Sequence, residues 1–121
     1  MNPKQEYKKL INSFKYAIEG IIASFKTERN MKIHIVVMII IVTFGFFLKL
    51  NKTEWCIIVI AIVLVLSAEL FNTAIETIVD MICPEKNSKA KLVKDISAGA
   101  VLIFAIGATI IGAIVFLPKL I

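Results

Sequence analysis

The hydrophobic positions of this 121-residue chain fall into stretches with different patterns. Residues 96–118 form a run of about 23 residues without charge, and residues 33–48 form a shorter apolar run between two lysines. A bilayer core needs about 20 apolar residues per helix, and lysines at the ends of the shorter run can reach the interfaces. The pattern predicts membrane-spanning helices at residues 32–50 and 95–118.

A third apolar stretch is unusual because it carries acidic residues. It begins at Trp55, an aromatic residue typical of membrane interfaces, and stays uncharged as far as Ala68. It then remains apolar on most of its surface until Pro84 stops it. This predicts a spanning helix at residues 54–82. Its second half carries four polar side chains, at Glu69, Asn72, Glu76 and Asp80.

Apolar residues near the start of the chain recur at steps of three and four, with lysines and other polar residues between them. This periodicity predicts an amphipathic helix at residues 1–28 that lies in the membrane interface. Its simplest role is an anchor or a packing lid over the spanning helices. We therefore expect one all-helical membrane domain, residues 1–121, with no room for a separate soluble catalytic domain.

Composition supports a membrane protein and bears on its partners and orientation. Hydrophobic residues make up 59% of the chain, against roughly 45–50% in an average soluble domain. The net charge of +5 comes from basic residues beside the apolar runs, which suits lipid headgroups or nucleotide phosphates better than nucleic acid. Of the 14 Lys and Arg residues, eleven precede the first span or separate the second from the third. The positive-inside rule therefore puts the N-terminus in the cytoplasm and the C-terminus outside.

The four polar residues of the 54–82 helix share one face. At about 100° per residue they fall within an arc of roughly 80° and spread over about 16 Å of the axis. A carboxylate at mid-membrane depth costs at least ~2.5–3.5 kcal/mol, so this face points to function. The alternative is a polar network between the helices of an oligomer. In the predicted orientation Asp80 lies near the cytoplasmic surface, and Glu69 lies about 16 Å deeper.

Glu28 lies between the N-terminal helix and the first span, at the same predicted level as Glu76 and Asp80. Paired carboxylates at this level suit Mg²⁺, which takes one or two protein carboxylates and completes its shell with water and nucleotide phosphates. The lysines before the third span would face those phosphates. Lys94-Asp95, at the expected start of that helix, would add the positive potential of a helix N-terminus. A solvated positive-inside loop explains these lysines equally well, and no P-loop is present.

The sequence from Glu69 to Asp80, ELFNTAIETIVD, resembles the signature of the small prokaryotic diacylglycerol kinase and undecaprenol kinase family. The resemblance extends over nearly the whole chain, from the amphipathic N-terminal helix and Glu28 to Lys94-Asp95 at the head of the third span. It implies a homotrimeric integral membrane enzyme of the bacterial plasma membrane. Such an enzyme transfers the γ-phosphoryl group of ATP to a lipid hydroxyl at the cytoplasmic interface.

Carried over residue by residue, the resemblance implies a role for each polar position. Glu69 would be the general base near the lipid hydroxyl, and Glu28 and Glu76 would hold the Mg²⁺ that bridges the nucleotide phosphates. Asn72 would support this cluster. The residues implied to bind the nucleotide are Lys94 and Asp95, with Tyr16 and the loop residues Glu85, Lys86 and Asn87 near the adenosine.

The lipid acceptor stays open between undecaprenol and diacylglycerol. The stretch from Glu28 to His34 is more similar to the Gram-positive branch, which is associated with undecaprenol, so we favour undecaprenol. We interpret His34 itself as a headgroup-level or packing residue. Two alternatives come from other classes: an ion-coupled transporter with Glu69 and Glu76 as protonation sites, and a non-catalytic membrane subunit. The transporter alternative gives Glu28 and Lys94 no role.

Overall fold

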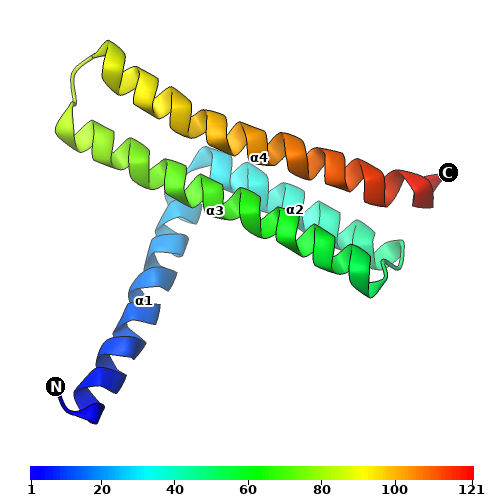
Figure 1. Cartoon of the computed structure of the whole chain (residues 1–121), viewed down its shortest axis with the longest axis horizontal. Helices are drawn as coiled ribbons and strands as arrows, with labels where there is room; N and C mark the ends of the chain where they lie inside the picture. Colours follow the sequence, from blue (N-terminus) through cyan, green and yellow to red (C-terminus); the bar gives the residue numbers. More distant parts are fainter.

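The computed structural model describes every residue, Met1–Ile121, as four α-helices without a strand. In chain order these are α1 (Pro3–Thr27), α2 (Arg29–Phe47), α3 (Lys52–Ile82) and α4 (Ser88–Leu120). Helices α2, α3 and α4 lie alongside one another, and α1 projects away from them (Figure 1). Each of α2, α3 and α4 is long and apolar enough to cross a membrane. The all-helical fold with three candidate spans is therefore confirmed.

The start of α1 and its junction with α2 are fixed by local hydrogen bonds. The Asn2 side chain accepts from the Gln5 backbone N–H at 2.8 Å, and the Gln5 side chain accepts from the Asn2 N–H at 3.1 Å. At the other end Glu28 has an extended backbone, with φ −98° and ψ 118°. Because this one residue separates two helices, the chain changes direction there and Glu28 lies at the corner (Figure 1).

The turn between α2 and α3 is a compact helix C-cap. Lys49 has a left-handed backbone, with φ 56°, and its N–H donates to the Phe46 carbonyl at 3.3 Å. The Leu50 N–H donates to the Gly45 carbonyl at 3.1 Å. This pair of bonds is the Schellman motif, which satisfies carbonyls that the end of α2 leaves free. Asn51 then caps the start of α3.

The best-packed part of the bundle lies next to this turn, where the antiparallel α3 and α4 meet. The ring of Trp55 lies against that of Phe46, with centroids 4.8 Å apart. Lys119 of α4 pairs with Glu54 of α3 at 3.0 Å. Trp55 also packs against a small core of three buried residues, Leu50, Ile58 and Val115. This end of the molecule is closed by apolar packing and an ion pair together.

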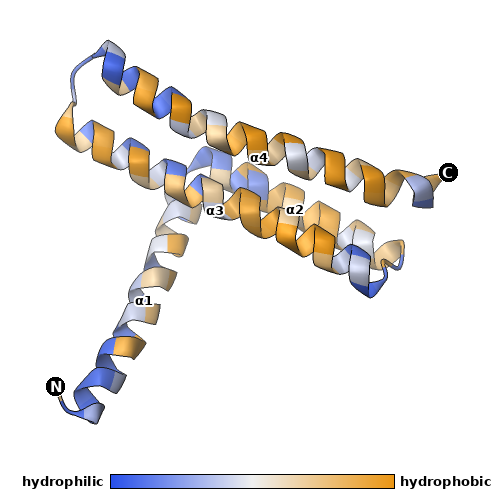
Figure 2. Ribbon diagram, in the orientation of Figure 1, coloured by the Kyte–Doolittle hydropathy of each residue, from blue (hydrophilic) through white to orange (hydrophobic).

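Most of the apolar surface of the bundle is not covered within one chain. Only 13 of 121 residues are buried, and hydrophobic residues line the outside of α2, α3 and α4 (Figure 2). Exposing such a surface to water costs about 25 cal/mol for each Å². Lipid or other membrane helices must therefore cover it, as expected for a multi-pass membrane protein.

Helix α4 begins earlier than the apolar pattern predicts. The pattern places the start of the third spanning helix at Lys94-Asp95, but α4 starts at Ser88. The Asn87 side chain caps it by accepting two backbone N–H groups of its first turn, at 2.9 and 3.0 Å. The prediction of the helix start was wrong because hydropathy marks only the apolar part of a helix. The positive helix N-terminus therefore lies at Asn87, about 10 Å along the axis from Lys94.

Candidate active site

The polar stripe of α3 lies at the end of the bundle where the α3–α4 loop joins the two helices. Asn72 Nδ2 donates to Glu76 Oε1 at 3.2 Å, one helical turn away. Glu69, a turn deeper, is almost fully enclosed, with 1% of its surface exposed. The predicted stripe is therefore graded, from the enclosed Glu69 through the half-buried Glu76 to the exposed Asp80.

The Glu69 carboxylate faces α2. Its Oε2 lies 3.7 Å from Nε2 of His34, while the Thr73 hydroxyl donates to the Glu69 backbone carbonyl and leaves the carboxylate alone. The sequence interpretation of His34 as a headgroup or packing residue overlooked this neighbour. One signal for it was present in the sequence, since His34 is the only ionisable residue between Lys32 and Lys49.

Glu28 approaches the same region from the corner between α1 and α2. It is half-buried, and both Glu28 and Glu76 lie within electrostatic range of Glu69. Asn72 Oδ1 is buried without a hydrogen-bond partner. A buried oxygen of this kind needs a ligand or water. Glu28 and Glu76, from the α1–α2 corner and from α3, therefore lie near Glu69, and Asn72 adds an unpaired amide oxygen on the same face of α3.

The donor set of this region can be tested against Mg²⁺. No three acidic, histidine or cysteine side chains of the chain form a ready-made cation cage. Mg²⁺ needs no such cage, because it typically keeps several waters and takes phosphate oxygens beside one or two carboxylates. Two glutamates and the free Asn72 oxygen therefore fit magnesium that arrives with a nucleotide.

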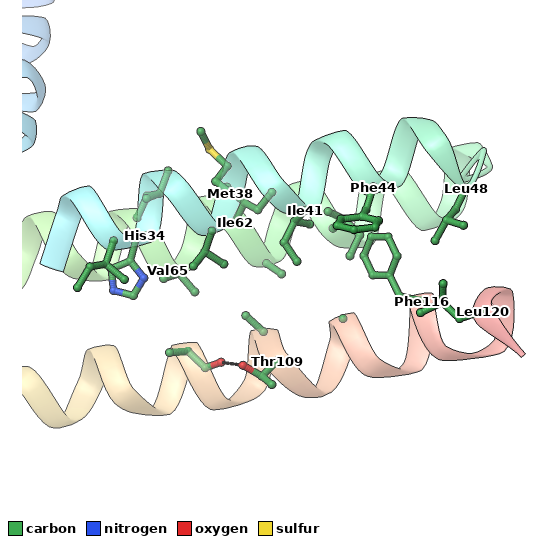
Figure 3. Close-up of a pocket in the computed structure, with 18 residues that line it drawn as sticks. His34, Met38, Ile41, Phe44, Leu48, Ile62, Val65, Thr109, Phe116 and Leu120 are labelled. Atoms are coloured by element: carbon green, nitrogen blue, oxygen red, sulfur yellow. Dashed lines mark hydrogen bonds between the residues drawn. The ribbon is translucent and has the colours of Figure 1, made fainter.

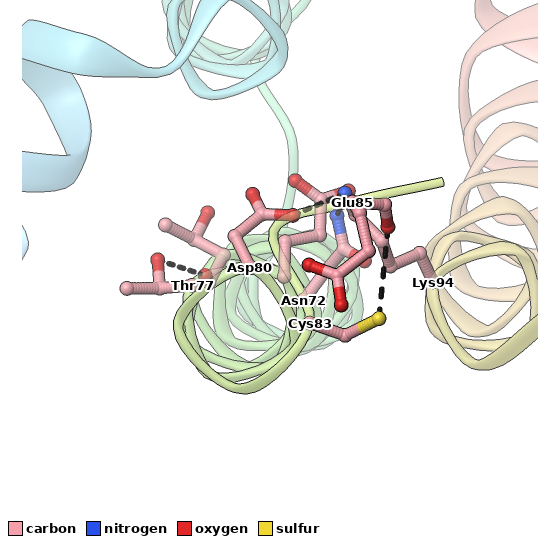
Figure 4. Close-up of polar contacts among 8 residues, drawn as sticks. Asn72, Thr77, Asp80, Cys83, Glu85 and Lys94 are labelled. Carbon is pink, nitrogen blue, oxygen red and sulfur yellow. Dashed lines mark hydrogen bonds and ion pairs between the residues drawn. The ribbon is translucent and has the colours of Figure 1, made fainter. Parts of the chain in front are cut away.

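Two lysine–aspartate pairs lie at the outer end of the stripe and beyond it, toward the α3–α4 loop. Lys94 Nζ lies 2.6 Å from Asp80 Oδ1 and so joins α4 to α3 (Figure 4). Lys91 Nζ lies 2.6 Å from Asp95 Oδ2 within α4, on an exposed surface. Glu76 is also within electrostatic range of Lys94. The structure thus brings Lys94 to the outer end of the stripe and gives Asp95 a separate partner.

The remaining predicted site residues are not gathered into this cluster. Tyr16 is exposed on α1, which projects away from the bundle (Figure 1). Glu85 and Lys86 are exposed in the α3–α4 loop, where the Glu85 carbonyl accepts from the Cys83 thiol at 3.6 Å (Figure 4). The Asn87 side chain is occupied as the cap of α4. Within one chain, the residues predicted to lie near the adenosine therefore form two separate groups.

An apolar groove of 650 Å³ runs between α2, α3 and α4 and ends at His34 (Figure 3). Of its 18 lining residues, 15 are hydrophobic. The Thr109 hydroxyl is already bonded to the Ala105 carbonyl at 2.8 Å. Leu48 and Leu120 lie at the far end (Figure 3). The apolar groove therefore extends along the spans to the imidazole of His34, which lies beside Glu69.

Comparison with known proteins places this site in a family. The family model described as prokaryotic diacylglycerol kinase matches residues 15–116. An undecaprenol kinase of Bacillus subtilis is 41% identical, over 97% of this chain and 95% of its own. A diacylglycerol kinase of Synechocystis is 38% identical over 92% of this chain, which spans 64% of that relative. A diacylglycerol kinase of Haemophilus influenzae is 34% identical over 78% of this chain and 80% of its own.

The chain therefore belongs to the prokaryotic diacylglycerol kinase family. It is an integral membrane lipid kinase, and ATP is the phosphoryl donor that a kinase family implies. Membership confirms the resemblance carried by residues 69–80. Membership in a kinase family also argues against the two alternatives from other classes, the transporter and the non-catalytic subunit.

Proposed function

We propose that this protein transfers the γ-phosphoryl group of MgATP to undecaprenol and so forms undecaprenyl phosphate. Diacylglycerol, which would give phosphatidic acid, is the second candidate acceptor. The undecaprenol kinase matches at 41% identity over 95% of its length, against 38% over 64% for the Synechocystis diacylglycerol kinase. The observation that carries the chemistry is the enclosed Glu69 carboxylate beside the end of an apolar groove.

Glu69 is the general base in this proposal. The lipid hydroxyl gives its proton to a Glu69 oxygen as the hydroxyl oxygen bonds to the γ-phosphorus. The bond from that phosphorus to the bridging oxygen breaks, and ADP leaves with the electron pair. Glu69 lies about 10 Å deeper along α3 than Glu76, which suits a base that meets a membrane alcohol rather than a soluble ligand. Phosphoryl transfer asks mainly for positioning and charge neutralisation, which this small site can supply.

Glu28 and Glu76 are the proposed magnesium ligands, with Asn72 as their support. Asn72 donates to Glu76 at 3.2 Å and so orients that carboxylate, while its own oxygen stays free. Glu28 reaches the region from the corner between two helices, where its backbone is held by the bond of its N–H to the Ser24 carbonyl. When bound, Mg²⁺ would neutralise charge on the nucleotide phosphates.

The nucleotide occupies the outer side of this cluster in the proposal. Lys94 would contact the phosphates, since its pair with Asp80 holds the ammonium beside the stripe, and Asp95 would contact the nucleotide from the same helix. The adenosine would lie near Tyr16 and the loop residues Glu85, Lys86 and Asn87. Because Tyr16 projects away from that loop within one chain, we propose that neighbouring copies in a homotrimer share the site.

We propose a plasma-membrane topology that presents this site to cytoplasmic ATP. The N-terminus and the α3–α4 loop face the cytoplasm, and the C-terminus lies outside, as the distribution of basic residues favours. Residues 1–28 lie in the interface. The spans within the single domain 1–121 cover residues 32–50, 54–82 and 95–118.

Transfer of labelled phosphate tests the function. The full chain in detergent–lipid micelles with Mg²⁺ and radiolabelled ATP receives undecaprenol or dioleoylglycerol in parallel. We expect label in both or only in undecaprenol, with the higher kcat/KM for undecaprenol. A higher value for dioleoylglycerol would reassign the acceptor. Label in neither lipid, from monodisperse protein, would overturn the proposal.

A further inference from the structure

We propose that His34 is a positioning residue for Glu69. In the complex with the lipid, its Nε2–H donates to Oε2 of Glu69 and so holds the carboxylate in the orientation that receives the lipid proton. This inference rests on the proposed function, in which Glu69 is the general base. It gives a role in catalysis to a side chain that the sequence alone indicates only as a headgroup-level or packing residue.

The first support is the isolation of the Glu69 carboxylate from every other cation. The side chain of Glu69 is 2% exposed, and His34 is the one basic side chain within ion-pair distance of it. The other ion pairs of the chain involve Asp95, Asp80 and Glu54. An enclosed carboxylate is costly unless a donor or a cation satisfies it. His34 is therefore the available partner from a neighbouring helix.

The second support is the arrangement of like charges on the other sides. Glu28 and Glu76 both lie within electrostatic range of Glu69 and repel its negative charge. Asn72 is a favourable neighbour on α3 itself, and His34 adds the one basic side chain, from a different helix. If Oε2 is held by the imidazole, Oε1 remains for the lipid hydroxyl. The positioning role follows from this division between the two oxygens.

The distance suits a contact that tightens when the substrate binds. The distance of 3.7 Å between Nε2 and Oε2 is longer than the roughly 2.7–3.2 Å of a typical hydrogen bond. A small side-chain rotation would bring the two atoms within hydrogen-bond distance. Catalytic hydrogen bonds are often long without ligand and shorten in the productive complex. His34 is also part of the groove wall, with 21% of its side chain exposed, so a lipid that fills the groove presses directly on it.

Two substitutions at His34 separate positioning from packing. His34→Leu keeps an apolar side chain but removes the donor, whereas His34→Gln places an amide N–H where the imidazole has Nε2–H. Met38→Leu is the matched control, because Met38 lies one turn further along α2 in the same groove and its side chain has no hydrogen-bond donor. Each full-length variant is assayed for transfer to undecaprenol, and thermal unfolding in detergent monitors the fold.

We expect His34→Leu to lower kcat by at least about 10-fold, and by no more than the 10²–10⁴-fold that a general base contributes, with the KM for ATP unchanged. His34→Gln should restore kcat to within a few-fold of the wild type, and Met38→Leu should resemble the wild type. Wild-type kcat in His34→Leu would overturn the inference. So would equal loss in His34→Gln and His34→Leu, because the ring itself would then be required.

A loss of kcat accompanied by a raised KM for ATP and lower thermal stability would also overturn the inference, in favour of a structural role. Failure of the proposed function has a different signature. In that case the wild-type protein itself labels neither lipid, and no difference among the variants can appear. Active wild-type protein with an indifferent His34→Leu variant contradicts only the role of His34.

Discussion

The two ends of the helical bundle differ in whether their buried polar groups have hydrogen-bond partners. At the turn end, which comprises the α2–α3 turn and the last turns of α4, polar groups are paired. Lys119 pairs with Glu54, Asn51 caps α3, and the backbone of the turn is closed by its own hydrogen bonds. At the site end, which comprises the α1–α2 corner and the α3–α4 loop side, two buried side-chain atoms have no partner. These are Ser24 Oγ and Asn72 Oδ1.

This difference separates stability from function along one molecule. A buried polar group without a partner costs about 1–3 kcal/mol, so the site end carries a penalty that apolar residues would avoid. A ligand that supplies the missing partners removes that penalty and gains affinity from doing so. Substitutions at the site end should therefore change activity more than stability, and substitutions at the turn end should do the reverse.

The largest effect is expected at the site end from Glu69→Gln. The amide keeps the size of the side chain but cannot take a proton, so kcat should fall by roughly 10²–10⁴-fold. Binding of Mg²⁺ with a non-hydrolysable ATP analogue, measured by calorimetric titration, should change little. Loss of nucleotide binding in this variant would show that Glu69, despite its greater depth in the membrane, takes part in nucleotide binding together with the metal ligands.

Glu76→Gln is the matched control for that experiment, because it is the same chemical change two turns nearer the loop. Here the apparent affinity for the magnesium nucleotide and the turnover should both fall. If only turnover fell, the proposed role of Glu76 in holding magnesium would be wrong.

At the turn end, Gly45→Ala should cost about 1–3 kcal/mol of stability, because an added methyl group must displace packed side chains. Its Cβ would lie 2.6 Å from Trp55 Cη2 and 3.1 Å from Leu50 Cδ1. Thermal unfolding in detergent measures the loss, and activity per folded protein should be retained. Gly107→Ala is the control, since its Cβ would meet no atom within 4 Å. Equal destabilisation by both changes would contradict the packing explanation.

A smaller effect is expected from Lys94→Gln. Removing one charge from the phosphate side should raise the KM for MgATP by about 10-fold, which corresponds to about 1.4 kcal/mol. Lys52→Gln removes the same charge from an exposed lysine at the turn end and should leave KM unchanged. An identical rise in both variants would assign the effect to net charge rather than to Lys94.

The sequence predicted the spans and the polar stripe because both follow from local periodicity. The early start of α4 was missed, since two polar helical turns after Asn87 carry the same composition as a loop. The sequence marks His34 as the only ionisable residue of its apolar run, but it does not show that His34 contacts Glu69. The α2 span is apolar all round, so its pattern marks no inward face. How α2 is rotated against α3 depends on packing between distant residues, which hydropathy does not encode.

The smallest effect tests the turn end by improving it. Lys49 has φ 56°, a conformation in which a side chain is costly and glycine is not. Lys49→Gly should therefore stabilise the protein by about 0.5–1 kcal/mol, after allowance for the greater freedom of unfolded glycine. Lys89→Gly, in the first turn of α4, should destabilise it instead, because glycine disfavours a helix. Opposite shifts in thermal unfolding would locate strain at Lys49. Shifts of the same sign would mean that the hydrogen bonds of the turn, and not its backbone conformation, decide its stability.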